Sequence, residues 1–207
     1  MKNKKLIIII ATVLVAIAGV GAIAYVISND KKSESNPGAY YGSSADGFTT
    51  SVDRNEHLGT VEVVSKDAVA AAFGQNAEVG SPEESGTVKL GATKSETATF
   101  AVKTPKGKVS FEVDVRTYSS RVDLDKAGVF VGTQEPKVEG VGEEAHFLVP
   151  AQQDLFKEQQ VALIATKGKT SYKFALVQQS DNLVFTTDEA KAIVLEIAKQ
   201  SNLGAVK

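Results

Sequence analysis

Cysteine and tryptophan are both absent from this 207-residue chain, and only two histidines are present. Without cysteine the chain has no disulfide, no thiolate metal site, no thiol nucleophile and no lipidated cysteine anchor. The two histidines, His57 and His146, stand in no known catalytic or zinc-binding motif. A lone histidine in a strand is more often structural than catalytic, so we expect no catalytic residue, cofactor or metal.

Most of the chain carries no net positive charge. The formal net charge is −2, from 23 basic and 25 acidic residues. Residues 1–32 carry a net charge of +4, so the remaining residues carry −6. An acidic body lacks the positive surface that binding to a nucleic-acid backbone requires. The composition therefore argues against a nucleic-acid partner.

Charged residues are also missing from Leu6 to Ile27, a run of 22 residues of which 13 are leucine, isoleucine or valine. As a helix this run would span about 33 Å, enough to cross a hydrocarbon core of about 30 Å. Lysines at positions 2, 4 and 5 favour a cytoplasmic N-terminus. We therefore predict a cytoplasmic tip (1–5), a transmembrane signal anchor (6–28) and an extracellular C-terminal domain of a single-pass membrane protein.

A cleaved secretory signal peptide is the alternative for the same segment. Ala22-Ile23-Ala24 matches the small-x-small pattern of a cleavage site, with cleavage after Ala24. The apolar run is longer than the hydrophobic region of a typical signal peptide, which favours the anchor. Both interpretations place the rest of the chain outside the cytoplasm and differ only in whether it stays tethered.

Residues 29–58 are rich in serine, glycine, asparagine and aspartate and show no sustained apolar period. Such a segment buries too little apolar surface to offset the entropy of ordering it. We predict a flexible spacer that reaches about 30 Å from the membrane.

Residues 59–207 show the alternation and capping of an α+β domain. Val109, Phe111, Val113 and Val115 alternate with polar residues, which is typical of a half-buried antiparallel strand. The predicted strands are 60–64, 96–103, 109–118, 145–149, 160–166 and 171–178, and the predicted helices are 65–73, 123–130 and one beginning at the capping box of Thr186 and Glu189. Residues 75–90 are expected to be mostly loop. This order predicts an antiparallel sheet with helices packed on one face.

Two segments carry a family resemblance. The first resembles the opening helix of bacterial cell-envelope lipoproteins of the LpqN type and reads Ser65-Lys66-Asp67-Ala68-Val69-Ala70-Ala71-Ala72-Phe73-Gly74. The second resembles a strand entry of the same proteins and reads Val138-Glu139-Gly140-Val141-Gly142-Glu143-Glu144-Ala145-His146-Phe147. The resemblance implies a PsbP-like fold, in a family largely without assigned activity. Those proteins are usually anchored through a lipidated cysteine, and here a transmembrane helix would take its place.

Two other glycine-containing or acidic segments look like ligand motifs but fit better as local structure. Gly140-Val141-Gly142 lacks the third glycine of a dinucleotide fingerprint and precedes a strand, so we expect a tight turn. The segment from Asp123 to Gly128 begins like a calcium loop, but Gln134 stands where that loop needs a bidentate glutamate. We expect Asp123 to cap a short helix instead.

Two predicted hairpin tips share the sequence Lys-Gly-Lys, at Lys106-Gly107-Lys108 and at Lys167-Gly168-Lys169. If both tips lie at one end of the sheet, Lys106, Lys108, Lys167 and Lys169 form a basic spot suited to anionic lipid headgroups or wall polymers. The alternative is that glycine makes each turn while lysine keeps its edge soluble.

The sequence thus predicts a membrane-anchored extracytoplasmic binding or accessory domain of the bacterial cell envelope. We expect it to be non-enzymatic, with a lipid, a wall polymer or an envelope protein as its ligand. Two alternatives stay open: an envelope hydrolase that uses aspartate, glutamate or serine, and a secreted, cleaved form of the same binding domain.

Overall fold

The computed structural model describes residues 42–43, 49–134, 136–149 and 157–206. The predicted transmembrane segment 6–28 and the predicted cleavage point at Ala24 lie outside these residues. Within the described ranges, no helix combines the length and apolar character needed to cross a bilayer.

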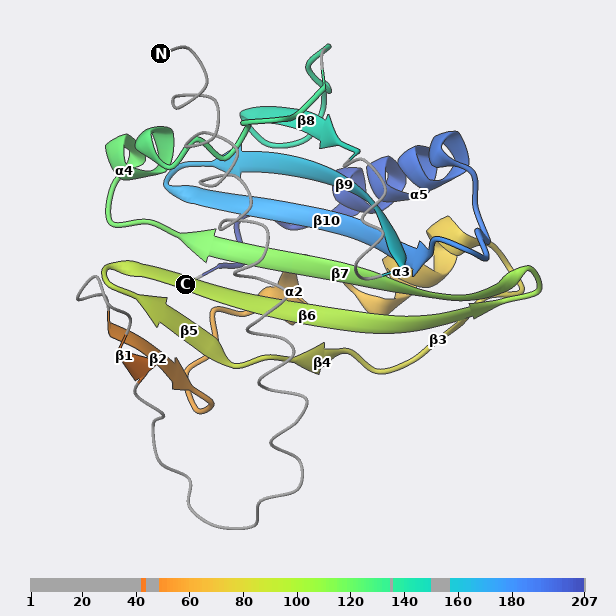
Figure 1. The fold of residues 1–207 in the computed structure, drawn as a ribbon, viewed down its shortest axis with the longest axis horizontal. Coiled ribbons are helices and arrows are strands. Elements are labelled where there is room, and N and C mark those ends of the chain that lie inside the picture. Colours follow the sequence, from red (N-terminus) through yellow and green to blue (C-terminus); the bar gives the residue numbers. More distant parts are fainter. Residues whose placement is uncertain (1–41, 44–48, 135, 150–156, 207) are drawn as a thin grey trace, which may run out of the picture. The chain divides into compact units, whose positions relative to one another are not determined.

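A large antiparallel sheet forms the centre of the described structure (Figure 1). Its strands are β1 (Gly42–Ser43), β2 (Thr49–Asp53), β3 (Glu78–Val79), β4 (Glu83–Glu84), β5 (Thr87–Leu90), β6 (Thr93–Thr104), β7 (Gly107–Thr117), β8 (Glu144–Leu148), β9 (Glu158–Lys167) and β10 (Thr170–Gln179). The order is β1-β2-β5-β6-β7-β10-β9-β8, and β3 and β4 also pair with β6. Four helices accompany the sheet in the described ranges: α2 (Thr60–Val63), α3 (Lys66–Phe73), α4 (Arg121–Lys126) and α5 (Thr187–Gln200). The predicted α+β class is therefore confirmed.

The predicted β6–β7 hairpin is confirmed, with the predicted alternation. Phe100 lies opposite Phe111, and Val113 lies opposite both Ala98 and Phe174 of β10. All five of these side chains are buried. Alternate residues of a strand point to the same face, so these cross-strand pairs build one continuous apolar layer.

The two best-patterned helices are also confirmed. Ser65 caps α3 by accepting a hydrogen bond from the Ala68 N–H, 3.1 Å away. Thr186 and Glu189 form the predicted capping box at the start of α5. α5 packs on β9 and β10, and α3 packs against α5. Burial of one stripe of α5 against the sheet stabilises a helix whose intrinsic propensity alone would be marginal.

Three local predictions are wrong. Residues Thr60–Val63 form the helix α2 instead of a strand, and residues 75–90 contain the three short strands β3, β4 and β5. The helix α4 is capped by Ser120, whose hydroxyl accepts a hydrogen bond from the Asp123 N–H, so Asp123 is a first-turn residue and not the cap. Each error concerns a short element of two to six residues.

The sheet also includes residues that were expected in the spacer. β2 pairs with β5 through Thr50–Leu90, Ser51–Lys89, Val52–Val88 and Asp53–Thr87. Leu58, at the end of the predicted spacer, is buried in the core. The folded part therefore begins before residue 59.

The tight turn predicted at Gly140-Val141-Gly142 is confirmed. Gly142 has a φ of 61°, in the left-handed region that favours glycine. A Cβ atom at this position would collide with the carbonyl oxygen of Thr166. Glycine is thus needed here for conformation and for space, which explains the motif without a nucleotide.

Candidate functional site

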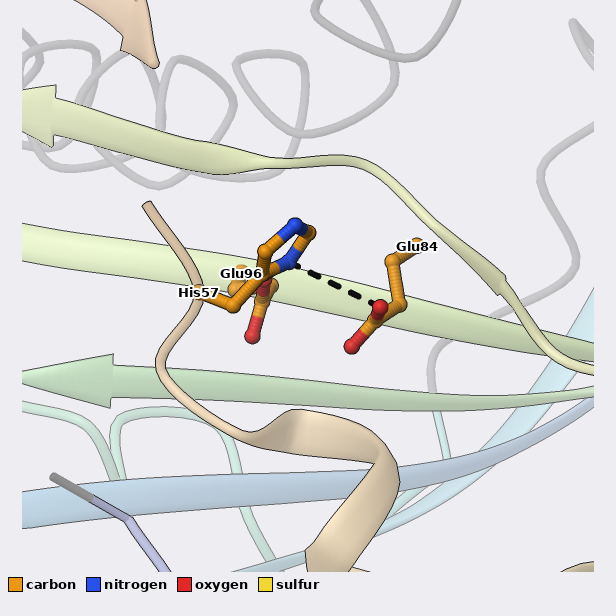
Figure 2. Close-up of side chains that lie close together, drawn as sticks. All are labelled: His57, Glu84 and Glu96. Carbon is orange, nitrogen blue, oxygen red and sulfur yellow. Dashed lines mark hydrogen bonds and ion pairs between the residues drawn. The ribbon is translucent and has the colours of Figure 1, made fainter. Parts of the chain in front are cut away.

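A buried carboxylate, Glu96 of β6, lies at the centre of a polar cluster in the described structure. Glu96 is 1 % exposed and shares a strand face with the buried Ala98 and Phe100. Three segments meet around it: the loop that contains His57, strand β4 with Glu84, and β6 itself (Figure 2). An ionised group in the core needs hydrogen-bond partners, because unpaired burial costs several kcal/mol.

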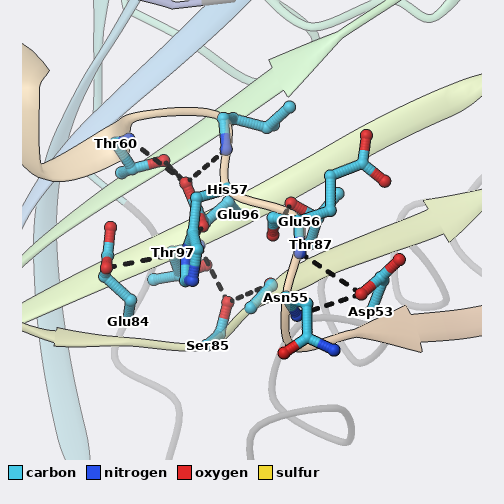
Figure 3. A network of polar contacts seen from close by, with 12 residues as sticks. Asp53, Asn55, Glu56, His57, Thr60, Glu84, Ser85, Thr87, Glu96 and Thr97 are labelled. Carbon is cyan, nitrogen blue, oxygen red and sulfur yellow. Dashed lines mark hydrogen bonds and ion pairs between the residues drawn. The ribbon is translucent and has the colours of Figure 1, made fainter. Parts of the chain in front are cut away.

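One oxygen of Glu96 accepts hydrogen bonds from the segment at the start of α2. Its Oε2 accepts hydrogen bonds from the Leu58 N–H at 3.0 Å, the Thr60 N–H at 3.1 Å and the Thr60 hydroxyl at 2.7 Å (Figure 3). The first N–H groups of a helix have no partner within the helix, so this carboxylate serves as a cap supplied from another element. The side chain of Glu96 is therefore fixed in orientation.

The other oxygen of Glu96 faces His57. The distance from His57 Nδ1 to Glu96 Oε1 is 2.8 Å, and the distance from the same nitrogen to Glu84 Oε2 is 3.6 Å. The hydrogen bond to Glu96 is the main cause of a raised pKa for His57, and the charge of Glu84 raises it further. The side chain of His57 is 45 % exposed, that of Glu84 25 %, and that of Glu96 is fully covered. The cluster thus opens to solvent on one side.

A set of short hydrogen bonds holds the segments around the cluster (Figure 3). The hydroxyl of Ser85 accepts a hydrogen bond from the Thr97 N–H at 3.0 Å, which ties β4 to β6. The Thr87 hydroxyl donates to the Glu56 carbonyl at 2.6 Å, and Asp53 Oδ1 accepts from the Glu56 N–H at 3.2 Å. The loop bearing His57 is thereby attached to β5 and to the end of β2, while the segment bearing Glu84 is attached to β6.

Sequence reasoning missed this cluster. His57 was expected in a spacer without partners, whereas it lies beside two glutamates in the folded domain. One signal was available: Glu96 occupies an inward position in an otherwise regular alternation with Ala98, Phe100 and Val102. A charge at an inward strand position indicates a partner brought from elsewhere in the chain.

The second histidine, His146 of β8, lies in a more apolar environment. Its ring centroid is 5.0 Å from that of Phe130 in an edge-to-face arrangement. Its Nε2 lies 3.2 Å from Glu144 Oε1. His146 is buried and packs against Phe130.

The two Lys-Gly-Lys tips do not lie together. The β9–β10 tip lies beside the end of β7, because Thr170 of β10 is opposite Thr117 of β7. The β6–β7 tip lies at the start of β7, where Thr104 pairs with Gly107. The ten residue steps from Gly107 to Thr117 span about 33 Å. Residues 106–108 and 167–169 therefore lie at opposite ends of the sheet, and the four lysines do not form a single basic spot.

Neighbouring acidic groups partly offset the positive charge of the two tips. Lys106 forms an ion pair with Glu189 at 2.7 Å and its Nζ lies 5.3 Å from the ring centroid of Phe185. At the other tip, the hydrogen bond from the Gly168 N–H is the main cause of a lowered pKa for Glu143, which also forms an ion pair with Arg121 at 2.6 Å and is near the charge of Lys167. These contacts favour the simpler interpretation of the tips as soluble turns.

A groove of about 690 Å³ lies beside the Lys106 tip. It is bordered by apolar and charged side chains, among them Val79, Lys103, Lys108, Val109, Glu158 and Val177. Lys103 forms an ion pair with Glu78 at 3.1 Å on its rim. The groove is broadly open to solvent and is not an enclosed cavity.

Comparisons with protein-family models, with curated proteins and with solved structures find no match to this chain. The resemblance to LpqN-type envelope lipoproteins therefore stays a prediction.

Proposed function

We propose that this chain is a membrane-tethered, extracytoplasmic binding domain of the bacterial cell envelope. The support for its location comes from the sequence: an uncharged run long enough to cross a bilayer, preceded by basic residues. The α+β domain that follows would be the part that binds. A PsbP-like arrangement, with helices on one face of the sheet, belongs to the same proposal.

The observation that carries the binding role is the groove of about 690 Å³ at the β6–β7 tip. Its border combines valines with two lysines, Lys103 and Lys108, and two glutamates, Glu78 and Glu158. A groove that pairs apolar surface with charged groups of both signs suits a molecule with both an acyl or aliphatic part and a polar head group. An amphiphilic lipid of the envelope is therefore the ligand that the geometry favours over a wall polymer or a protein.

Native mass spectrometry of the full chain in mild detergent tests this function. We expect an envelope lipid to remain bound to the wild-type protein and to be lost from the groove variants Lys108→Glu and Val177→Glu. The matched control is Lys169→Glu, a charge reversal at the far tip, which should retain the lipid. Absence of any bound lipid, or equal retention in all four proteins, would contradict the proposal.

An envelope hydrolase is the second candidate, and one observation favours it. Glu84 and Glu96 converge on His57, which is the kind of arrangement that acid–base catalysis uses. Assays with chromogenic esters, phosphates and glycosides would detect such an activity, and it should disappear in His57→Ala. Turnover that survives this substitution would exclude His57 from catalysis.

A further inference from the structure

We propose that His57, Glu84 and Glu96 bind one divalent first-row transition-metal ion. The three residues offer one imidazole nitrogen and two carboxylate oxygens, all within 4.8 Å of one another. None of them lines the groove, so this inference is independent of the lipid-binding proposal. The site is shown in Figure 2.

The distances fit a shared ion. Metal–ligand bonds of about 2.1 Å place two ligand atoms at most about 4.2 Å apart, and closer when they are adjacent in the coordination sphere. His57 Nδ1 lies 2.8 Å from Glu96 Oε1 and 3.6 Å from Glu84 Oε2. Both pairs are within that limit, and the side chain of Glu84, the outermost of the two carboxylates, can rotate to complete the set.

The surroundings of Glu96 fix one ligand in advance. Its Oε2 is occupied by three donors from Leu58 and Thr60, so only Oε1 is directed toward His57. Hydrogen bonds of this kind orient metal ligands in known sites and are needed for their full affinity. A rigid, buried carboxylate beside two more exposed ligands provides the preorganised part of the site.

The donor set also selects the class of ion. Imidazole nitrogen suits Zn²⁺, Fe²⁺, Ni²⁺ and Cu²⁺, whereas Mg²⁺ and Ca²⁺ prefer oxygen ligands alone. Three protein ligands on a partly exposed surface leave at least one coordination position for water. A first-row transition metal with an open position, represented by Zn²⁺, is therefore the expected occupant.

The test is isothermal titration of the untagged, EDTA-treated full chain in mild detergent with ZnCl₂ and with MgCl₂. We expect one Zn²⁺ per chain and binding at least about tenfold tighter than that of Mg²⁺. Glu84→Gln and His57→Ala should each weaken Zn²⁺ binding about tenfold or more. Both side chains are partly exposed, so these variants should keep the fold, as circular dichroism would verify.

The matched control is Glu83→Gln. Glu83 is the exposed neighbour of Glu84 in β4, and alternation along the strand directs it to the opposite face. Zn²⁺ affinity should be unchanged in this variant. The proposal is overturned if Zn²⁺ binds no more tightly than Mg²⁺, or if Glu84→Gln and His57→Ala bind Zn²⁺ as the wild type does. In those cases Glu96 is only a structural cap of α2, and the lipid-binding proposal is unaffected.

Discussion

Glu96 Oε1 lies 2.8 Å from His57 Nδ1, although the two residues are 39 positions apart in the chain. The same glutamate binds the backbone of Leu58 and Thr60 through its other oxygen. One buried side chain therefore attaches the loop before α2 to the central strand β6.

Replacement of Glu96 by alanine should destabilise the protein strongly. The change leaves the Leu58 and Thr60 N–H groups without an acceptor in the core, and each unpaired buried donor costs about 1–3 kcal/mol. We expect the free energy of unfolding to fall by about 3 kcal/mol or more, measured by urea denaturation.

Glu78→Gln is the control for that experiment. Glu78 forms an ion pair with Lys103 in which both side chains are well exposed. Surface pairs of this kind contribute at most about 1 kcal/mol, so this variant should unfold close to the wild type. Equal stabilities of the Glu96 and Glu78 variants would refute the anchoring role of Glu96.

Acidification should weaken the start of α5 through Glu189. Hydrogen bonds from Lys106 and from Thr186 lower the pKa of Glu189 to about 2, against an ordinary value of 4.5. Between these values the unfolded chain binds more protons than the folded one, so stability decreases as the pH falls. The contribution is present above about pH 4.5 and is lost as the pH approaches 2.

The measurement compares urea midpoints at pH 7 and pH 3 for wild type and Glu189→Gln. The wild type should lose more stability on acidification than the variant, because other carboxylates titrate equally in both. A variant whose pH dependence matches that of the wild type would show that Glu189 is not responsible.

Two glycine substitutions should differ in cost because of one carbonyl group. Gly142 and Gly168 have φ angles of 61° and 60°. Alanine in this left-handed conformation should therefore destabilise the folded state by the same amount, about 1–2 kcal/mol, at each position. A Cβ at Gly142 would meet the Thr166 carbonyl oxygen, whereas a Cβ at Gly168 would meet nothing within 4 Å. Thermal unfolding should therefore show Gly142→Ala to be clearly less stable than Gly168→Ala, and equal melting temperatures would contradict the predicted collision.

The regular elements of the fold were predictable from the sequence. Alternation in β7, from Val109 to Val115, marks one buried face, and Thr186 with Glu189 marks the start of α5. These signals are local, so they need no knowledge of the rest of the chain.

The helix α2 was not predictable in the same way. Thr60-Val61-Glu62-Val63 is rich in β-branched residues, which favour strands. The distant Glu96 supplies the hydrogen bonds that start the helix, and tertiary contacts override weak propensities. The short strands β3 to β5 were missed because two to four residues are too few to show a period.

The candidate metal site could be predicted only in part. The inward position of Glu96 is visible in the sequence, but its nearness to His57 depends on the path of the chain between them, which includes α2, α3 and the strands β3 to β5. The separation of the two Lys-Gly-Lys tips likewise follows from strand order, which sequence periodicity does not specify.

The state of the N-terminus separates a tethered protein from a secreted one. Intact-mass spectrometry of the mature chain from membranes should show residues 6–28 retained. A mature N-terminus immediately after Ala24, with the protein in the medium, would instead support the cleaved form.

Protease accessibility in spheroplasts is the most direct test of the central claim, that residues 59–207 are displayed outside the cytoplasm. A reporter fused to the C-terminus should be degraded by added protease while a cytoplasmic marker stays intact. A reporter that remains protected until the membrane is dissolved would contradict the account.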